Sequence, residues 1–268
     1  CRYGFWSFEI MFEDETSGYF KRPERIACQN VAFAITQGHK RSELLSKENN
    51  IDLNKIFNIP VAGRKSELLR RNYFLHDSLN IHKEKKIALF MGAIAKWAMI
   101  DELIENMSCF PEEWVLVLHD RYGSYPEWFM DRVTPYLKGK IFISPFQMLN
   151  NKELRVLVSS ADLGLAFYKA NYSDCYDGKN LKYLGFSSGK IATYLQYGVP
   201  VLVNDIGELS SWLVENNIGI MIKNMQDIGT EIRKFDFEKV RERCVRAFDA
   251  YLSFSNYEKL ILNLIEAE

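Results

Sequence analysis

The chain has 268 residues, 47% of them hydrophobic and 14% aromatic, which is enough for a substantial core and excludes an intrinsically disordered protein. Its 34 basic and 35 acidic residues leave a net charge of −1, so the overall charge gives no support to a nucleic-acid-binding function. The five cysteines form neither a C-x-x-C pair nor a Cys/His cluster, which favours reduced thiols in a cytoplasmic protein over disulfides or a metal site. No apolar run reaches the ~18 residues of a membrane span, and no signal peptide is visible.

The first part of the chain has the pattern of an incomplete α/β unit. Predicted strands and the helices between them fall at 5–10, 23–30, 31–36, 40–49 and 56–61. The chain begins at Cys1, inside the run that leads into the first predicted strand, so we expect a shortened piece of a larger protein. We therefore predict a partial Rossmann-like lobe over residues 1–80.

From Lys86 onward, apolar strand-like runs alternate with helical patterns. The predicted strands are 86–94, 114–120, 140–146, 162–169, 200–205 and 218–223. Strands without polar alternation are typical of a parallel sheet covered on both faces, and βαβ crossovers then predict a doubly wound, Rossmann-like α/β domain. We expect this domain to span residues 81–250.

The C-terminal segment, residues 251–268, contains an amphipathic helix. We expect it to pack back onto the N-terminal lobe. Attachment to a membrane surface is less favoured, because the polar face of the helix is not rich in Lys and Arg.

The stretch "YLGFSSGKIATYLQYGVPVLVND" (183–205) has some features of a nucleotide-binding P-loop. A P-loop needs four residues between its glycines and a hydroxyl residue after its lysine. Only three residues separate Gly185 from Gly189, and Ile191 follows Lys190. The P-loop interpretation therefore fails on both counts.

In open α/β sheets, ligands bind beyond the carboxyl ends of the strands, so the residues that follow each predicted strand are candidate site residues. The candidates are Gly92, Lys96, His119, Asp120, Pro145, Phe146, Gln147, Ser187, Ser188, Gly189, Lys190 and Glu208.

Two of these places suit a diphosphate. Gly189 allows close backbone approach at a helix start whose free N–H groups attract an anion, Ser188 can cap the helix or donate to phosphate, and Lys190 adds a charge. Gly92 offers a second close approach across the cleft, with Lys96 one turn later. The alternative is that Ser188 is only a helix cap and Lys190 a solvated first-turn residue.

Three further residues each have two interpretations. His119 is either a proton carrier at the cleft edge or a satisfied strand-end histidine, and the second is favoured. Glu208 either complements a helix dipole or binds a sugar hydroxyl. Glu9 lies in an acidic run that favours a solvated loop, but it follows an apolar strand and would face the cleft of a complete enzyme.

The stretch "SSGKIATYLQYGVPVLVNDIGELSSWLVENNIGIMI" (187–222) combines a helix, a "PV" strand, a glycine–glutamate turn, a second helix and a glycine before the last strand. Together with "KIALFMGAIAKW" (86–97) and the segment 32–64 ending in an "IP" turn, it resembles GT-B glycosyltransferases, particularly the group-1, family 4-like sugar transferases. This resemblance implies two Rossmann-like domains, with a nucleotide-sugar bound mainly by the C-terminal one. It also implies that the N-terminal lobe, residues 1–80, is on the acceptor side.

The resemblance also implies roles for residues. Gly92 and Lys96 would flank the donor diphosphate from one side and Ser187–Lys190 from the other, while Pro145–Gln147 would lie against the nucleobase. Two glutamates that the family often carries eight positions apart are Gly185 and Thr193 here, and the Thr193 hydroxyl could bond the ribose. No D-x-D motif is visible, which fits a transferase without a metal or other cofactor.

We therefore predict a glycosyltransferase that moves a sugar from a nucleoside-diphosphate sugar to a glycan or lipid-linked acceptor, in bacterial polysaccharide or glycan biosynthesis. The catalytic residue is not identified, and Glu9 and His119 are its candidates. The alternatives are a nucleotide-sugar epimerase of the same architecture and a non-catalytic nucleotide-sugar-binding protein. The expected location is cytoplasmic, and a peripheral membrane contact stays open.

Overall fold

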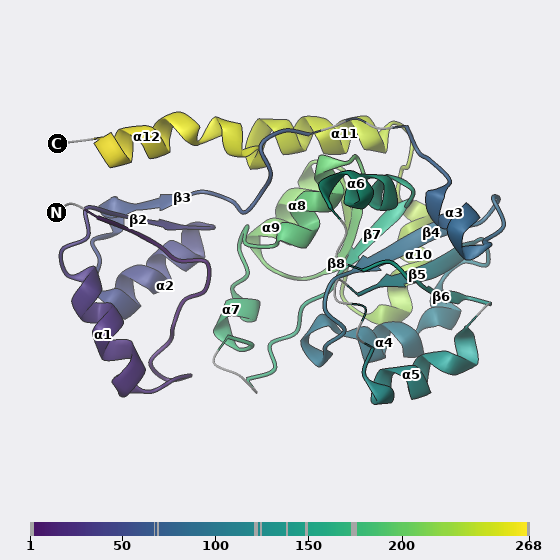
Figure 1. Ribbon diagram of the computed structural model, residues 1–268, viewed down its shortest axis with the longest axis horizontal. Helices are drawn as coiled ribbons and strands as arrows, with labels where there is room; N and C mark the ends of the chain where they lie inside the picture. Colours follow the sequence, from purple (N-terminus) through teal and green to yellow (C-terminus); the bar gives the residue numbers. More distant parts are fainter. Residues whose placement is uncertain are drawn as a thin grey trace.

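The computed structural model describes residues 3–66, 68, 70–120, 123, 125–137, 139–147, 150–172 and 176–266. These residues form two α/β units, each with its own parallel sheet (Figure 1). We call the unit with the three-stranded sheet the small lobe and the unit with the six-stranded sheet the large lobe. The helix α7 lies between them, and α12 extends from the large lobe toward the small one.

The small lobe has the strand order β1-β2-β3, with all neighbours parallel. Its elements are β1 (Gly4–Trp6), α1 (Gly18–Cys28), β2 (Phe33–Thr36), α2 (His39–Asn49) and β3 (Ile56–Asn58).

The predicted strands at 5–10 and 56–61 were too long at their carboxyl ends. β1 ends at Trp6, because the chain leaves β2 after a last hydrogen bond from Ser7 N–H to the Ile35 carbonyl. β3 stops short of Pro60, which has no N–H to donate.

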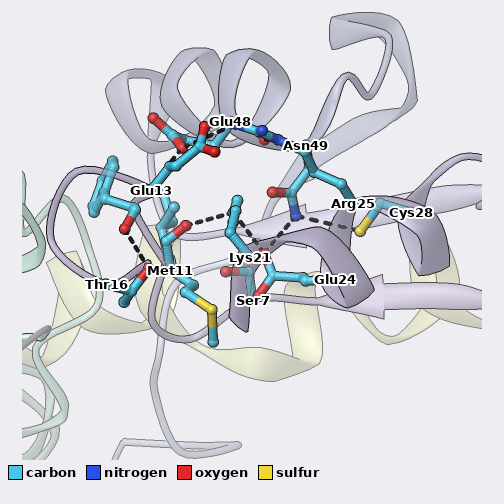
Figure 2. Close-up of polar contacts among 12 residues, drawn as sticks. Ser7, Met11, Glu13, Thr16, Lys21, Glu24, Arg25, Cys28, Glu48 and Asn49 are labelled. Carbon is cyan, nitrogen blue, oxygen red and sulfur yellow. Dashed lines mark hydrogen bonds and ion pairs between the residues drawn. The ribbon is translucent and has the colours of Figure 1, made fainter. Parts of the chain in front are cut away.

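A buried polar cluster holds the helices of the small lobe to the loop after β1 (Figure 2). The fully buried ammonium of Lys21 donates to the Met11 carbonyl and pairs with the Glu24 carboxylate at 2.8 Å. Asn49 of α2 donates to the same carboxylate at 2.7 Å and contacts the Cys28 thiol at 3.3 Å. The cluster therefore links α1, α2 and the chain that enters α1.

The large lobe has the strand order β6-β5-β4-β7-β8-β9, and all its neighbouring strands are parallel. Its strands are β4 (Lys86–Met91), β5 (Trp114–His119), β6 (Ile141–Ile143), β7 (Leu163–Ala166), β8 (Val201–Asn204) and β9 (Gly219–Ile222). The order reverses between β4 and β7, so the carboxyl ends of these two strands flank the crevice of a doubly wound sheet. The predicted fold class and all six predicted strands of this lobe are confirmed.

Helices cover both faces of this sheet (Figure 1). They are α3 (Phe74–Leu79), α4 (Ile100–Glu105), α5 (Glu127–Val133), α6 (Asn151–Ser159), α8 (Gly189–Gln196), α9 (Glu208–Glu215), α10 (Ile228–Lys234) and α11 (Val240–Ala247). The two helices away from this sheet are α7 (Lys179–Lys182), between the lobes, and α12 (Glu258–Glu266), which extends toward the small lobe. Leu89 and Phe90 are both fully buried, one in the core on each face. This two-sided burial explains why the strands show no polar alternation.

The limits predicted for the three regions, 1–80, 81–250 and 251–268, stay predictions. After α11 the chain contacts the segment between the lobes: the Ser255 hydroxyl donates to the Arg64 carbonyl at 2.7 Å, and Arg64 pairs with Glu258 of α12 at 3.3 Å.

Within the described ranges, no helix combines the length and the apolar character needed to cross a bilayer.

Candidate functional site

A cavity of about 430 Å³ opens at the carboxyl edge of the large sheet. Its walls come from the ends of β4 and β5, from α6 and from the first turns of α8. The lining residues are Met91, Gly92, His119, Asn151, Leu154, Gly189, Lys190 and Thr193. This is the location at which a doubly wound sheet binds its ligand.

Lys190 places a positive charge in this cavity without a partner for it. Its ammonium is buried and makes no hydrogen bond to any described residue. The nitrogen lies 4.5 Å from the ring centre of Phe90, and the rings of Tyr168 and Trp97 lie at 5.5 and 6.0 Å. Burial lowers the pKa of Lys190 to about 8. The aromatic faces attract the cation but do not replace the hydrogen bonds that water would make.

Gly92 and Lys190 lie directly against each other. A Cβ at Gly92 would sit 2.9 Å from the Lys190 Cε, and the φ of Gly92 is +135°, a conformation that side chains rarely adopt. Gly92 also donates its N–H to the His119 carbonyl at 3.0 Å. The structure therefore brings the turn after β4 and the start of α8 to the same cavity.

The serines before α8 bond to nearby protein groups. The Ser188 hydroxyl accepts the Ile191 N–H at 3.2 Å, as a helix cap does, and lies 2.6 Å from the Tyr168 hydroxyl. The Ser187 hydroxyl donates to the Leu184 carbonyl at 2.7 Å. Ser188 thus fixes the helix start, and Gly189 and Lys190 line the cavity.

Thr193 and His119 line the same cavity as Lys190. The Thr193 hydroxyl donates to the Gly189 carbonyl at 2.7 Å, one turn back along α8. His119 is buried, its Nδ1 lies 3.0 Å from the Ser144 hydroxyl, and burial lowers its pKa. Burial therefore favours the neutral form of this imidazole over the charged one.

Lys96 and the segment after β6 are not among the residues that line this cavity. Lys96 lines a separate cavity of about 540 Å³ together with Glu102 and Lys169. The Phe146 ring packs 5.0 Å from the Phe74 ring. Pro145 and Gln147 are the sequence neighbours of Phe146 in the loop after β6.

Glu208 and Glu9 lie where the lobes meet. The Glu208 carboxylate accepts the Lys40 N–H of the small lobe at 3.0 Å, near the start of α2. Glu9 has a half-exposed side chain 3.9 Å from the Arg41 guanidinium. Neither carboxylate lines the 430 Å³ cavity.

The sequence analysis missed Met91, Asn151 and Leu154 of the cavity wall. Asn150 caps α6 in a capping box with Glu153, so the start of this helix was recognisable from the sequence. The predicted candidates after β6 were the loop residues Pro145–Gln147, whereas the cavity is lined by Asn151 and Leu154 of the helix that follows.

The described residues contain no group of three or more His, Cys, Asp or Glu side chains placed to hold a metal ion. The arrangement that the cavity does offer is a lysine ammonium, a helix start and a glycine turn, which together suit an anionic group.

Part of the chain matches a known protein family. Residues 139–262 match the family model described as glucosyltransferase 3-like, C-terminal domain. No curated protein matches the chain in sequence.

Several solved structures share the fold. The chain superposes on WaaG, a glycosyltransferase involved in lipopolysaccharide biosynthesis, with a TM-score of 0.66 at 14% identity, covering 99% of this chain and 75% of that one. Anabaena HepE in complex with UDP gives a TM-score of 0.77 at 12% identity, covering 100% and 72%. Sucrose-phosphate synthase from Thermosynechococcus elongatus gives 0.66 at 15% identity, covering 96% and 64%.

The chain has the fold of these GT-B glycosyltransferases. Within that class, residues 139–262 are similar to the C-terminal domain of the glucosyltransferase 3-like proteins.

Proposed function

We propose that this protein transfers a sugar from a nucleoside-diphosphate sugar to an acceptor, and that it binds the donor diphosphate between Gly92 and the start of α8. The observation that carries the proposal is the buried, unpartnered ammonium of Lys190 beside Gly92. A buried charge without a partner is costly, so its presence in a cavity indicates an anionic ligand that completes it. The solved complexes of Anabaena HepE with UDP and with UDP-glucose make a uridine nucleotide the first donor to test.

The cavity suggests how the donor would lie. The diphosphate would accept from Lys190 and from the N–H groups that open α8, while Gly92 leaves room for its oxygens. The Thr193 hydroxyl would face the ribose, and Asn151 would offer an amide to the polar groups of the donor. Sugar transfer leaves negative charge on the departing diphosphate, and these groups would stabilise that charge as it develops. We propose on this basis a transfer that needs neither a metal nor a cofactor besides the donor.

The acceptor would approach from the small lobe, where Glu9 and Glu208 lie at the junction of the lobes. We propose a glycan or lipid-linked acceptor in bacterial glycan biosynthesis. The similarity to WaaG, whose role is in lipopolysaccharide biosynthesis, supports this choice. A cytoplasmic location and a peripheral membrane contact stay predictions.

Calorimetric titration with UDP, UDP-glucose, GDP and ADP tests the proposal. We expect UDP to bind, and we expect Lys190→Met to weaken its binding at least tenfold, since a charge-assisted bond to phosphate is worth about 1.5–3 kcal/mol. Lys234→Met, at an exposed lysine of α10, is the matched control and should bind as the wild type does. Equal UDP affinity in wild type and Lys190→Met would contradict the proposal that the diphosphate binds at Lys190.

A product assay separates the transferase from the epimerase alternative. A transferase releases free UDP when acceptor is present, whereas an epimerase returns a sugar that is still attached to the nucleotide. An intact UDP-sugar of changed configuration would therefore contradict the proposed function.

A further inference from the structure

The segment 178–186, which we call the strap, belongs to the large lobe but is bonded mainly to the small one. It contains α7 and lies between the two lobes (Figure 1). It runs directly into Ser187 and the start of α8, so its position sets where that helix begins.

Asn180 makes the most buried of these contacts. Its amide donates to the Ile10 carbonyl at 2.8 Å and accepts the Ile10 N–H at 2.9 Å. Asn180 is 2% exposed and Ile10 is 1% exposed. One side chain therefore satisfies both peptide groups of a residue 170 positions away, as a neighbouring strand would.

Further hydrogen bonds hold the strap along its length. They join Lys179 N–H to the Glu15 carboxylate at 2.7 Å, Arg41 to the Tyr183 carbonyl at 3.3 Å, Phe186 N–H to the Gln37 carbonyl at 2.5 Å and Val61 N–H to the Phe186 carbonyl at 3.0 Å. A Cβ at Gly178 would lie 2.4 Å from a Glu15 carboxylate oxygen, so a larger residue at this position would displace the Glu15 side chain.

We propose that Asn180 is a positioning residue for donor binding. By clamping the Ile10 peptide of the small lobe it fixes the strap, and the strap holds Ser188–Lys190 in the geometry that receives the donor diphosphate. The inference rests on the proposed function for the identity of the ligand. We call the two hydrogen bonds between Asn180 and Ile10 the clamp, and these bonds do not depend on the proposed function.

The variant Asn180→Ala tests the clamp. Without these two buried hydrogen bonds the strap should leave the small lobe in a larger fraction of molecules, and those molecules would not hold the start of α8 ready for the donor. We therefore expect the dissociation constant for UDP to rise about tenfold, as it would if about one molecule in ten stayed competent to bind. We also expect faster amide hydrogen exchange over residues 184–191. A purely structural role would lower the melting temperature without these two local effects.

Asn72→Ala is the matched control. Asn72 donates to the Ser159 hydroxyl at 2.8 Å and accepts the Phe74 N–H at 2.9 Å, but all of these groups belong to the large lobe. It should lower the melting temperature while leaving UDP affinity and exchange over 184–191 unchanged. If Asn180→Ala does not fold, Glu15→Ala removes the partner of the Lys179 N–H at a part-buried site and should show the same effects more weakly.

Unchanged UDP affinity together with unchanged exchange over 184–191 in Asn180→Ala would overturn the inference. If the wild type binds no UDP, the proposed function fails, and the exchange measurement alone then decides on the clamp. Faster exchange over 184–191 in Asn180→Ala supports the clamp in that case, and unchanged exchange overturns it.

Discussion

The buried ammonium of Lys190 makes the stability of the folded protein depend on pH. Its ammonium is buried among three aromatic rings, and burial brings its pKa to about 8. Because the unfolded chain keeps a lysine pKa near 10.4, the unfolded state holds more protons between pH 8 and pH 10.4. The free energy of unfolding therefore rises with pH between pH 8 and pH 10.4. Below pH 8 the full cost of burying the charged ammonium is present.

We predict that Lys190→Met stabilises the protein at pH 7 by about 1–3 kcal/mol, because methionine fills similar space without a charge to desolvate. Urea denaturation at pH 7 measures the gain. At pH 10.5 the gain should be much smaller, since lysine is then neutral in the folded state. A loss of stability at pH 7 would show that the aromatic rings compensate the buried charge.

A second prediction concerns the pH dependence of UDP binding. A diphosphate needs the protonated ammonium, so the affinity of the wild type should fall above pH 8 by about tenfold per pH unit, until the higher pKa of the bound state is passed. Calorimetric titrations between pH 7 and pH 9.5 check this. The affinity of Lys190→Met, although weaker, should show no such decline.

At the scale of elements, the Lys21 cluster links α1 to α2 through the Glu24 carboxylate. Lys21→Met leaves the Glu24 carboxylate with a single amide partner and removes a donor from the Met11 carbonyl. We predict a loss of about 3–5 kcal/mol, the usual cost of breaking a buried ion pair by removing one partner. Denaturant unfolding provides the measurement.

The exposed pair Lys40–Glu43 on α2 is the matched control for this prediction, with side chains 51% and 57% exposed. Lys40→Met should cost less than about 1 kcal/mol, because exposed ion pairs contribute little. Equal losses in the two variants would mean that the Lys21 pair behaves as a surface pair.

The elements also show what the sequence could and could not predict. Leu89 and Phe90 lie next to each other in a strand buried on both faces, and such apolar runs made all six strands of the large lobe recognisable. The helix α7 has four residues and no apolar periodicity, and it is held by contacts with distant residues such as Ile10 and Glu15. The surroundings of Lys190 come from Phe90, Trp97 and Tyr168 in separate segments, and no local pattern brings them together.

At the scale of the molecule, the two lobes are expected to unfold together. A three-stranded sheet with two helices buries little apolar surface by itself, and the strap contacts tie it to the large lobe. We therefore predict one cooperative thermal transition. UDP at about 100 times its dissociation constant should stabilise the folded state by about 2.7 kcal/mol and raise the midpoint by roughly 5–10 °C. Differential scanning calorimetry with and without UDP measures both, with Lys190→Met as the variant in which the shift is reduced. Two transitions, of which UDP moves only one, would show that the lobes unfold independently and that the strap does not couple them.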